Sequence, residues 1–257
     1  MIIVDTVEIF LADNYVRCEL SDGKKYRILL KDYENLPFEC KPESRLENIT
    51  IDTDKIGLSE TNGYFDGDCA GFLAFLSKKY TIYKSAISKV ALTDVPKKQL
   101  FQKLYFAFRK NSPGTDPGLL KTLCLLVCGE FEAQGYLDDR RYAADKAKYL
   151  KEYKKYGSGK IKQHLYQKGI PSDIINEILE DESFSDEESE LSNMTGLLEK
   201  KYGANLDRLD KSDKNEIQKA VNMLVRNGYR YPSARNAVAA FTDKDIDYMI
   251  DYMEDED

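Results

Sequence analysis

The sequence predicts a mainly α-helical protein: tandem three-helix repeats in an extended array, preceded by a small β-rich N-terminal domain. Three observations predict it. Apolar residues alternate with period two over the first thirty residues, helical spacing replaces this pattern after about residue 68, and similar segments recur about sixty residues apart. With 257 residues, of which 42% are hydrophobic, the chain has enough apolar material for an ordinary soluble core.

The β-rich domain is expected over residues 1–67. Val16, Cys18 and Leu20 share one face of a strand, and a second alternating run covers residues 26–30. Asp22-Gly23 between the two runs supplies the positive backbone angles of a tight turn, which predicts a hairpin from residue 20 to residue 26. Residues 31–66 are rich in turn signals.

Three helical repeats are then expected at residues 68–134, 135–184 and 185–242, followed by an acidic tail at 243–257. Each repeat has an apolar pair spaced by four residues, and successive pairs are offset by 61 and 59 residues: Leu100/Leu104, Ile161/Leu165 and Ala220/Leu224. A period near sixty with one three-helix unit per repeat indicates units that bury their apolar faces against their neighbours. Such arrays usually offer long binding surfaces.

Residues 135–170 form the centre of this array. Asp138 or Asp139 is expected to cap a helix that runs to about Tyr156, a length of about 28 Å. The run Gly157-Ser158-Gly159 is expected to end that helix, with Ser158 capping the next one. The paired aspartates are interpreted as helix caps rather than as a metal or acid–base pair.

Charge is distributed unevenly. The net charge of −7 hides a balance of +8 over residues 140–168, −9 over residues 173–190 and −7 over residues 243–257. The acidic runs are most simply solubilising linkers and tails. A sharper hypothesis is that they compete within the chain for the basic surface.

Few residues suggest catalysis. His164 is the only histidine, which excludes most Ser-His-Asp, Cys-His and multi-histidine metal schemes. Cys124 and Cys128 lie one helical turn apart among leucines, so they are interpreted as buried small hydrophobes rather than metal ligands. No glycine pattern predicts a nucleotide site. We therefore expect no catalytic residue, metal or cofactor, and a cytoplasmic protein without a signal sequence or membrane span.

Residues 135–143, GYLDDRRYA, followed at 156–170 by YGSGKIKQHLYQKGI, resemble the central repeat of the RecX family, the bacterial regulators of the RecA recombinase. Residues 85–104 resemble the first repeat of that family and residues 219–238 resemble its third. The resemblance covers about residues 85–241. The chain departs from the family pattern in its extra NSPGTDPG loop and in its acidic net charge.

The resemblance implies a non-enzymatic modulator that docks on a RecA filament on DNA and inhibits ATP hydrolysis, filament growth or strand exchange. Single-stranded DNA would be met mainly through the filament, and the chain is expected to act as a monomer. The alternative is a module that binds DNA directly without recombinase. The basic run is by itself typical of a solvated helix face, but the resemblance favours a partner surface formed by Arg140, Arg141, Lys146, Lys148, Lys151, Lys154, Lys155, Lys160 and Lys162.

Four tyrosines interleave with these cations on one side of the expected helix. Tyr142, near Ala143, is expected in the core of its own repeat. For Tyr153 and Tyr156 two interpretations stay open: core packing, or stacking on bases and partner contacts.

Overall fold

The computed structural model describes residues 2–46, 69–112, 114–181 and 186–241. The chain divides into two compact units, Met1–Leu137 and Asp138–Asp257. The expected domain boundary at residues 67–68 and the acidic tail at 243–257 lie outside the described residues. As predicted, the structure is mainly helical and begins with a small antiparallel sheet.

The sheet of the first unit has the order β1-β2-β3, with strands β1 (Val4–Phe10), β2 (Tyr15–Leu20) and β3 (Lys25–Leu29). The predicted hairpin is confirmed: Gly23 has φ +80° and donates its N–H to the carbonyl of Leu20 at 2.8 Å. Alternate residues of β2 point inward, as predicted, so Val16 and Cys18 are fully buried. Strand β3 ends one residue before the alternating run does, because α1 (Leu30–Glu34) begins at Leu30.

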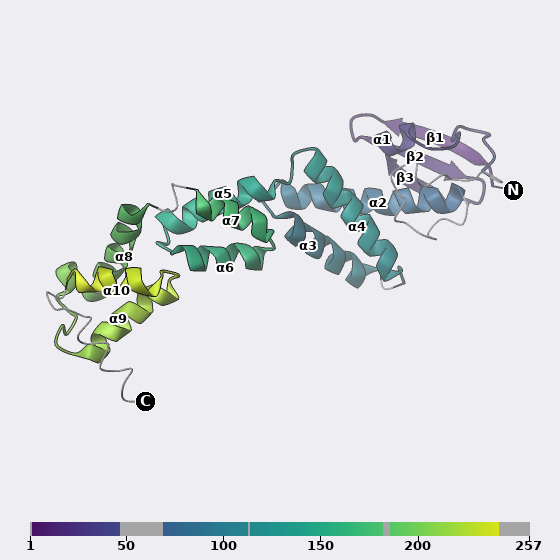
Figure 1. The fold of residues 1–257 in the computed structure, drawn as a ribbon. Helices are drawn as coiled ribbons and strands as arrows, with labels where there is room; N and C mark the ends of the chain where they lie inside the picture. Colours follow the sequence, from purple (N-terminus) through teal and green to yellow (C-terminus); the bar gives the residue numbers. More distant parts are fainter. Residues whose placement is uncertain (1, 47–68, 113, 182–185, 242–257) are drawn as a thin grey trace. The chain divides into compact units, whose positions relative to one another are not determined.

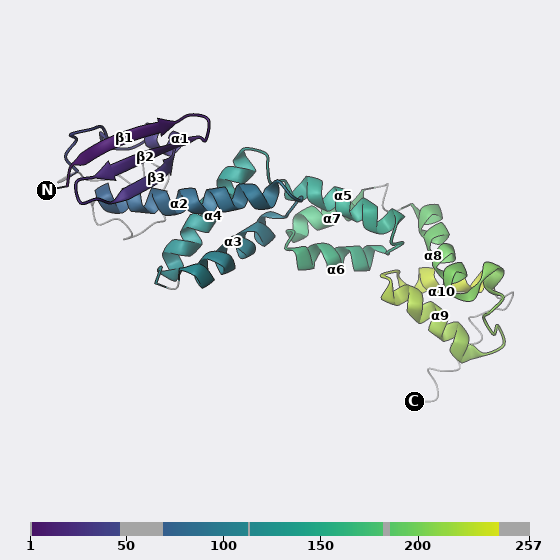
Figure 2. The same cartoon turned by 180° about the vertical axis from the view of Figure 1, so that it is seen from behind.

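Three longer helices complete the first unit: α2 (Cys69–Val90), α3 (Lys97–Asn111) and α4 (Pro117–Ala133). Helix α2 runs beside β3, which can be followed in Figures 1 and 2. One hydrophobic cluster extends from the sheet, at Val4, through α2 to the end of α4 and Leu137. The sheet and these three helices therefore share a single core, which the sequence pattern did not indicate.

A buried lysine reinforces that core. Lys79 of α2 is 7% exposed, and its Nζ lies 2.9 Å from Oδ1 of Asp32 and also contacts Glu130 of α4. Lys31 approaches the other oxygen of Glu130 at 2.7 Å. Two carboxylates against a buried ammonium supply the pairing that a desolvated charge requires, and they link α1, α2 and α4.

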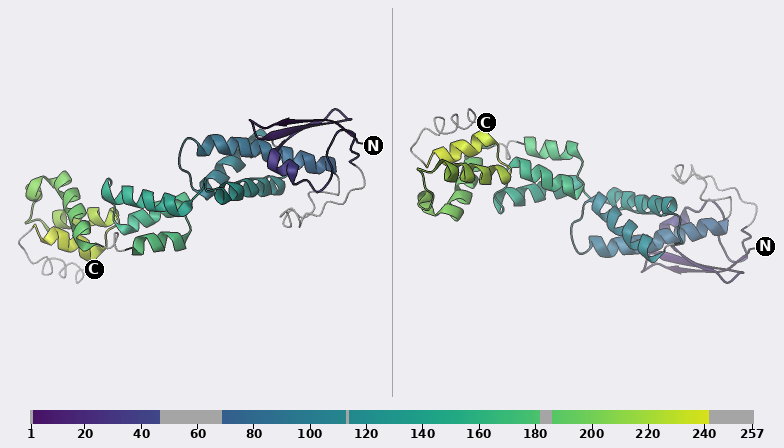
Figure 3. Two further views of the ribbon diagram at one scale, coloured as in Figure 1. Left: turned by 90° about the horizontal axis from the view of Figure 1, so that it is seen from above. Right: turned by 90° about the horizontal axis from the view of Figure 1, so that it is seen from below.

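The second unit contains two groups of three helices, both visible in Figure 3. The first group is α5 (Asp139–Glu152), α6 (Ser158–Lys168) and α7 (Ser172–Glu180). The second is α8 (Glu187–Tyr202), α9 (Lys214–Arg226) and α10 (Tyr231–Ala239), with a short 3-10 turn, η1 (Ala204–Leu206), after α8. Each group encloses its own hydrophobic cluster. The apolar pairs predicted to be equivalent lie on the second long helix of each three and are all buried: Leu100/Leu104, Ile161/Leu165 and Ala220/Leu224.

Glycines join these two groups by close backbone contact. The N–H of Gly157 donates to the carbonyl of Asn227 at 2.8 Å, and the N–H of Gly159 donates to that of Gly228 at 3.0 Å. A Cβ placed on Gly157 would lie 2.5 Å from the carbonyl carbon and oxygen of Gly228, which is too close for any side chain. The sequence indicated these glycines only as helix breaks. The structure shows that they also make the junction.

Candidate partner-binding surface

Helix α5 carries the first part of the expected surface. It begins where it was predicted to begin, because Oδ1 of Asp138 accepts a hydrogen bond from the N–H of Arg141 at 2.8 Å. Its predicted end at about Tyr156 is wrong. The helix stops at Glu152 after 14 residues, a length of about 21 Å, and Lys155 adopts a left-handed conformation with φ +52°.

Ser158 does not cap the following helix as predicted. Helix α6 begins at Ser158, and the N-cap position belongs to Gly157 and has no side-chain hydrogen bond. Gly157 occupies this place because its N–H donates to the carbonyl of Asn227 and because a side chain here would collide with the backbone of Gly228. A long-range contact, rather than a local cap, thus fixes the start of α6.

The nine expected cations therefore lie on two helices and the turn between them, rather than on one long helix and the start of the next. Arg140, Arg141, Lys146, Lys148 and Lys151 belong to α5, Lys154 and Lys155 to the turn after it, and Lys160 and Lys162 to α6. Arg141 and Lys154 are exposed and contact no carboxylate in the described part of the chain. These two side chains remain available to a partner.

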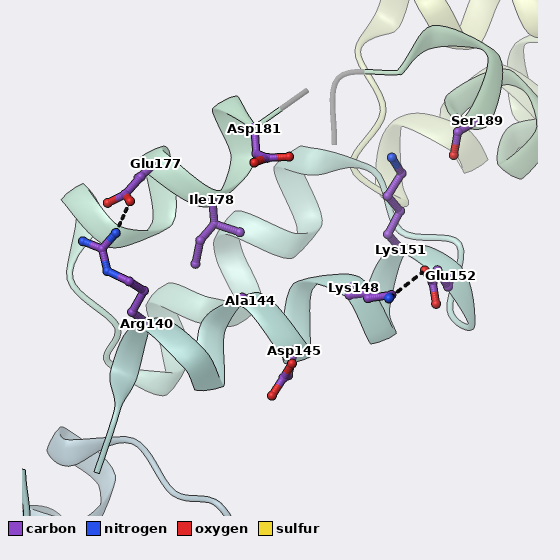
Figure 4. Close-up of a pocket in the computed structure, with 10 residues that line it drawn as sticks. All are labelled: Arg140, Ala144, Asp145, Lys148, Lys151, Glu152, Glu177, Ile178, Asp181 and Ser189. Carbon is purple, nitrogen blue, oxygen red and sulfur yellow. Dashed lines mark hydrogen bonds and ion pairs between the residues drawn. The ribbon is translucent and has the colours of Figure 1, made fainter. Parts of the chain in front are cut away.

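Cations and carboxylates share a hollow of about 560 Å³ beside α5 (Figure 4). Arg140 forms an ion pair with Glu177 of α7, and Lys148 lies 4.0 Å from Glu152 one helical turn away. Asp145 and Asp181 also line the hollow. We call this feature the mixed hollow. Its positive charge is already opposed by the chain's own acids, part of which belong to the acidic run at residues 173–190.

Three lysines of the set are held by asparagine side chains. The Nζ atom donates to an Oδ1 atom in each case: Lys155 to Asn193 at 3.0 Å, Lys160 to Asn227 at 3.0 Å and Lys162 to Asn176 at 2.9 Å. A neutral amide orients an ammonium without cancelling its charge. Lys155 also helps to hold the two helix groups together, because its carbonyl accepts a hydrogen bond from the Tyr229 hydroxyl at 2.9 Å.

A second hollow, which we call the basic hollow, forms where α6 meets the end of α9. Lys160, Arg226 and Arg230 surround it together with Ser158 and Gln163, and its volume is about 500 Å³. No carboxylate lines it, and neither arginine contacts an acid among the described residues. A space bordered by three cations, a hydroxyl and an amide offers donors suited to a phosphate group or to a surface carboxylate.

Sequence reasoning missed Arg226 and Arg230, which lie 66 and 70 residues beyond Lys160. The junction glycines bring them together, because Gly228 lies between the two arginines and touches Gly157 and Lys160. The one local signal was the pair of arginines around Asn-Gly-Tyr at residues 227–229. That pattern indicated a break between helices, but it did not indicate that residues 227–229 contact the start of α6.

The tyrosines separate into two environments. Tyr142 and Tyr156 are half-buried and pack against the core of the α5–α7 group, and the Lys160 ammonium lies 4.0 Å from the Tyr156 ring centre. Tyr149 and Tyr153 stack on the surface with ring centres 5.4 Å apart, and Tyr153 is 74% exposed. Of the two tyrosines left open by the sequence, Tyr156 belongs to the core and Tyr153 to the surface.

Comparisons with known proteins agree on one family. The model described as "RecX, second three-helix domain" matches residues 138–179. A regulatory protein RecX from Clostridium perfringens strain SM101 is 29% identical over 219 residues, covering 76% of this chain and 96% of the relative. A regulatory protein RecX from Trichlorobacter lovleyi is 30% identical over 97 residues, which cover 38% of this chain and 60% of that relative. The chain is similar to members of the RecX family, and these matches support its assignment there.

Solved RecX structures have the same fold. A crystal structure of regulatory protein RecX aligns with a TM-score of 0.63 at 14% identity, covering 95% of this chain and 100% of that one. The RecX structure from Lactobacillus salivarius aligns with a TM-score of 0.50 at 16% identity, covering 63% of this chain and 96% of that one. The RecX model matches α5–α7, which hold all nine expected cations, whereas Arg226 and Arg230 lie outside the match.

Other reactive groups of this chain are poorly placed for chemistry. Cys124 and Cys128 are fully buried in α4, as predicted, and burial raises the pKa of Cys124 to about 12 and that of Cys128 to about 11. His164 is half-buried, and desolvation, with Lys146 and Lys168 nearby, lowers its pKa. The described residues include no cluster of three or more His, Cys, Asp or Glu placed to hold a metal. None of their helices is both long and apolar enough to cross a membrane.

Proposed function

We propose that this chain is a non-enzymatic regulator that binds a RecA-type recombinase filament on DNA and inhibits its ATP hydrolysis, filament growth and strand exchange. Similarity to relatives that are named regulatory proteins supports a regulatory role. The resemblance of residues 135–170 to the central RecX repeat supports RecA as the partner. Recombination and DNA repair are the processes that such a regulator would control.

The basic hollow is the observation that carries the proposal in structural terms. Lys160, Arg226 and Arg230 gather at a junction held by backbone hydrogen bonds, without a carboxylate among the residues around them. Cations that are not already paired gain the most when they meet an anionic partner, because no internal ion pair has to be broken first. The hollow therefore supports a contact with filament phosphates or with an acidic patch of the recombinase.

The charge of the rest of the chain favours a filament over naked DNA. The net charge is −7, and the mixed hollow places Glu177 and Glu152 against the cations that would otherwise face DNA. Affinity for DNA alone depends on how many phosphates a protein neutralises and falls steeply with salt. A protein with a net negative charge needs additional contacts, and a recombinase filament offers protein contacts together with DNA.

Hydrolysis of ATP by the cognate recombinase on single-stranded DNA tests this function. The wild-type chain should slow hydrolysis at concentrations at which it scarcely binds naked DNA. The R226Q/R230Q variant should require a higher concentration for the same effect. The matched control K200Q/R208Q removes two exposed positive charges elsewhere in the second unit and should act like wild type. Unchanged hydrolysis with the wild-type chain would overturn the proposal.

A direct DNA-binding module is the second candidate, and the cationic lining of the basic hollow favours it. The two functions differ in their dependence on the recombinase. A direct binder would hold DNA tightly at low salt without recombinase, lose affinity steeply as salt rises and leave ATP hydrolysis unchanged at sub-saturating concentrations. That combination of results would replace the filament proposal.

A further inference from the structure

The first unit carries a hollow of its own, between the edge strand β3 and helix α2. Its volume is about 670 Å³, and its lining contains four cations and three hydroxyl side chains: Arg17, Lys25, Arg27, Lys84, Ser77, Tyr80 and Thr81. We call it the sheet hollow. Among the residues that the structure describes, no carboxylate lines it. Residues of β2 and β3 line one side of the sheet hollow and residues of α2 line the other. Helix α2 and β3 run side by side in Figures 1 and 2.

The register of the sheet places two guanidinium groups next to each other. Arg17 of β2 and Arg27 of β3 are directly opposite partners. Like charges in such positions destabilise a sheet. Glu8 compensates Arg17 at 2.9 Å, but neither Arg27 nor Lys84 contacts a carboxylate among the described residues. The packing of the core does not explain this uncompensated charge.

Aromatic rings hold both guanidinium groups in place. The rings of Phe10 and Tyr15 stack with centres 4.6 Å apart. The Cζ atom of Arg17 lies 5.0 Å from the centre of Phe10, and that of Arg27 lies 6.0 Å from the centre of Tyr15. Tyr80 of α2 extends the aromatic row, with its ring centre 5.4 Å from that of Tyr15. Contact with aromatic faces orients an arginine without neutralising it.

Hydroxyl groups complete the donor set. The N–H of Arg27 donates to Oγ of Ser77 at 3.2 Å, which ties the edge of β3 to α2 and leaves the serine proton for another acceptor. Tyr80 lines the same space, whereas the Thr81 hydroxyl already donates to the carbonyl of Ser77 at 3.0 Å. Two guanidinium forks, ammonium groups and hydroxyls around one hollow match the many acceptor oxygens of a phosphate. Arg27 and Lys84 are exposed, so the site is open to a long ligand.

We infer that the sheet hollow binds the phosphodiester backbone of single-stranded nucleic acid, with Arg17, Arg27 and Lys84 on the phosphates. Tyr80, which ends the aromatic row and lines the hollow, favours a single strand over a duplex, because only unpaired bases present free faces for stacking on its ring. This site needs no recombinase, so it goes beyond the function proposed for the second unit. Its affinity for naked DNA should be lower than the affinity of the chain for a filament, which offers protein contacts together with DNA. It gives the β-rich domain a binding role.

Fluorescence anisotropy of a fluorescein-labelled oligothymidylate, titrated with the full chain over a range of NaCl concentrations, tests the site. R27Q/K84Q removes the two uncompensated charges. K24Q/K41Q is the matched control, because Lys24 and Lys41 pair with Asp22 and Glu39 outside the hollow. Each phosphate contact on a single strand contributes about 0.7 to the salt slope, which is about fivefold in affinity at 0.1 M salt.

R27Q/K84Q should therefore lower the salt slope by about 1.4 and weaken binding about 25-fold at 0.1 M salt, whereas K24Q/K41Q should stay close to wild type. Photocrosslinks from a 4-thiothymidine oligonucleotide should fall in residues 15–27 and 77–84. Unchanged affinity and slope in R27Q/K84Q with a wild-type circular dichroism spectrum would overturn the inference, as would crosslinks confined to the second unit. Competition by polyglutamate as effective as that by unlabelled oligonucleotide would assign the site to an acidic protein and refute the nucleic-acid assignment.

Discussion

Substitution of Gly157 by alanine should separate the two helix groups of the second unit. The added Cβ would lie 2.5 Å from the carbonyl of Gly228, which is backbone and has no flexible end to move aside. Overpacking of this kind costs about 1–3 kcal/mol. Loss of the two junction hydrogen bonds, from Gly157 to Asn227 and from Gly159 to Gly228, adds about 1 kcal/mol each. We therefore expect a loss of about 3–5 kcal/mol from the junction.

Hydrogen exchange with residue-level resolution, combined with urea denaturation followed by circular dichroism, measures this effect. In G157A the amide of Gly159 should exchange faster, and the unfolding midpoint of the second unit should fall. Gly129 lies in α4 with no atom within 4 Å of an added Cβ, so G129A is the control and should be stabilised by about 0.5–1 kcal/mol. A G157A chain with wild-type stability and unchanged Gly159 exchange would refute the described junction.

Three further predictions concern charge. E177Q removes the acid paired with Arg140 and should strengthen single-stranded DNA binding at 0.1 M salt by about fivefold in an anisotropy titration; equal affinity would show that Arg140 is not a DNA contact. K79A leaves Asp32 and Glu130 buried without their cation, and should lower the free energy of unfolding by about 3–5 kcal/mol in thermal denaturation. K31A is the control and should lower it less. A smaller loss in K79A than in K31A would contradict the buried network. Burial raises the pKa of the Tyr229 hydroxyl above its unfolded value of 10.0. The unfolded chain therefore loses this proton first, so the free energy of unfolding should be unchanged below about pH 10 and should fall above it, less steeply in Y229F. Identical alkaline profiles of the two proteins would show that Tyr229 does not cause the loss.

Local sequence patterns predicted the elements that depend on local causes. The Asp22-Gly23 hairpin, the Asp138 cap and the buried pairs on α3, α6 and α9 all follow from turn chemistry and from spacing within one element. Each involves residues that are close in the sequence, where backbone preference and hydrophobic period act directly. The RecX resemblance then connected these elements to a family.

Contacts between distant segments were not predictable from those patterns. Tyr156 was expected to end α5, but the chain turns at Lys155, where Tyr229 donates to its carbonyl from 74 residues away. The basic run was expected to form one surface. Helix geometry instead directs Arg140 toward Glu177, and the junction directs Lys160 toward Arg226. A charge count along the chain contains no information about which acids or cations fold against it.

Filament recognition is tested by measuring binding of the labelled chain to recombinase filaments on single-stranded DNA and to the same DNA without recombinase, at one salt concentration. The chain should bind the filament at lower concentrations than it needs to bind naked DNA, and R226Q/R230Q should bind the filament more weakly than K200Q/R208Q. Equal affinity for filament and naked DNA, or equal filament binding by the two variants, would show that the chain does not recognise the filament through the basic hollow.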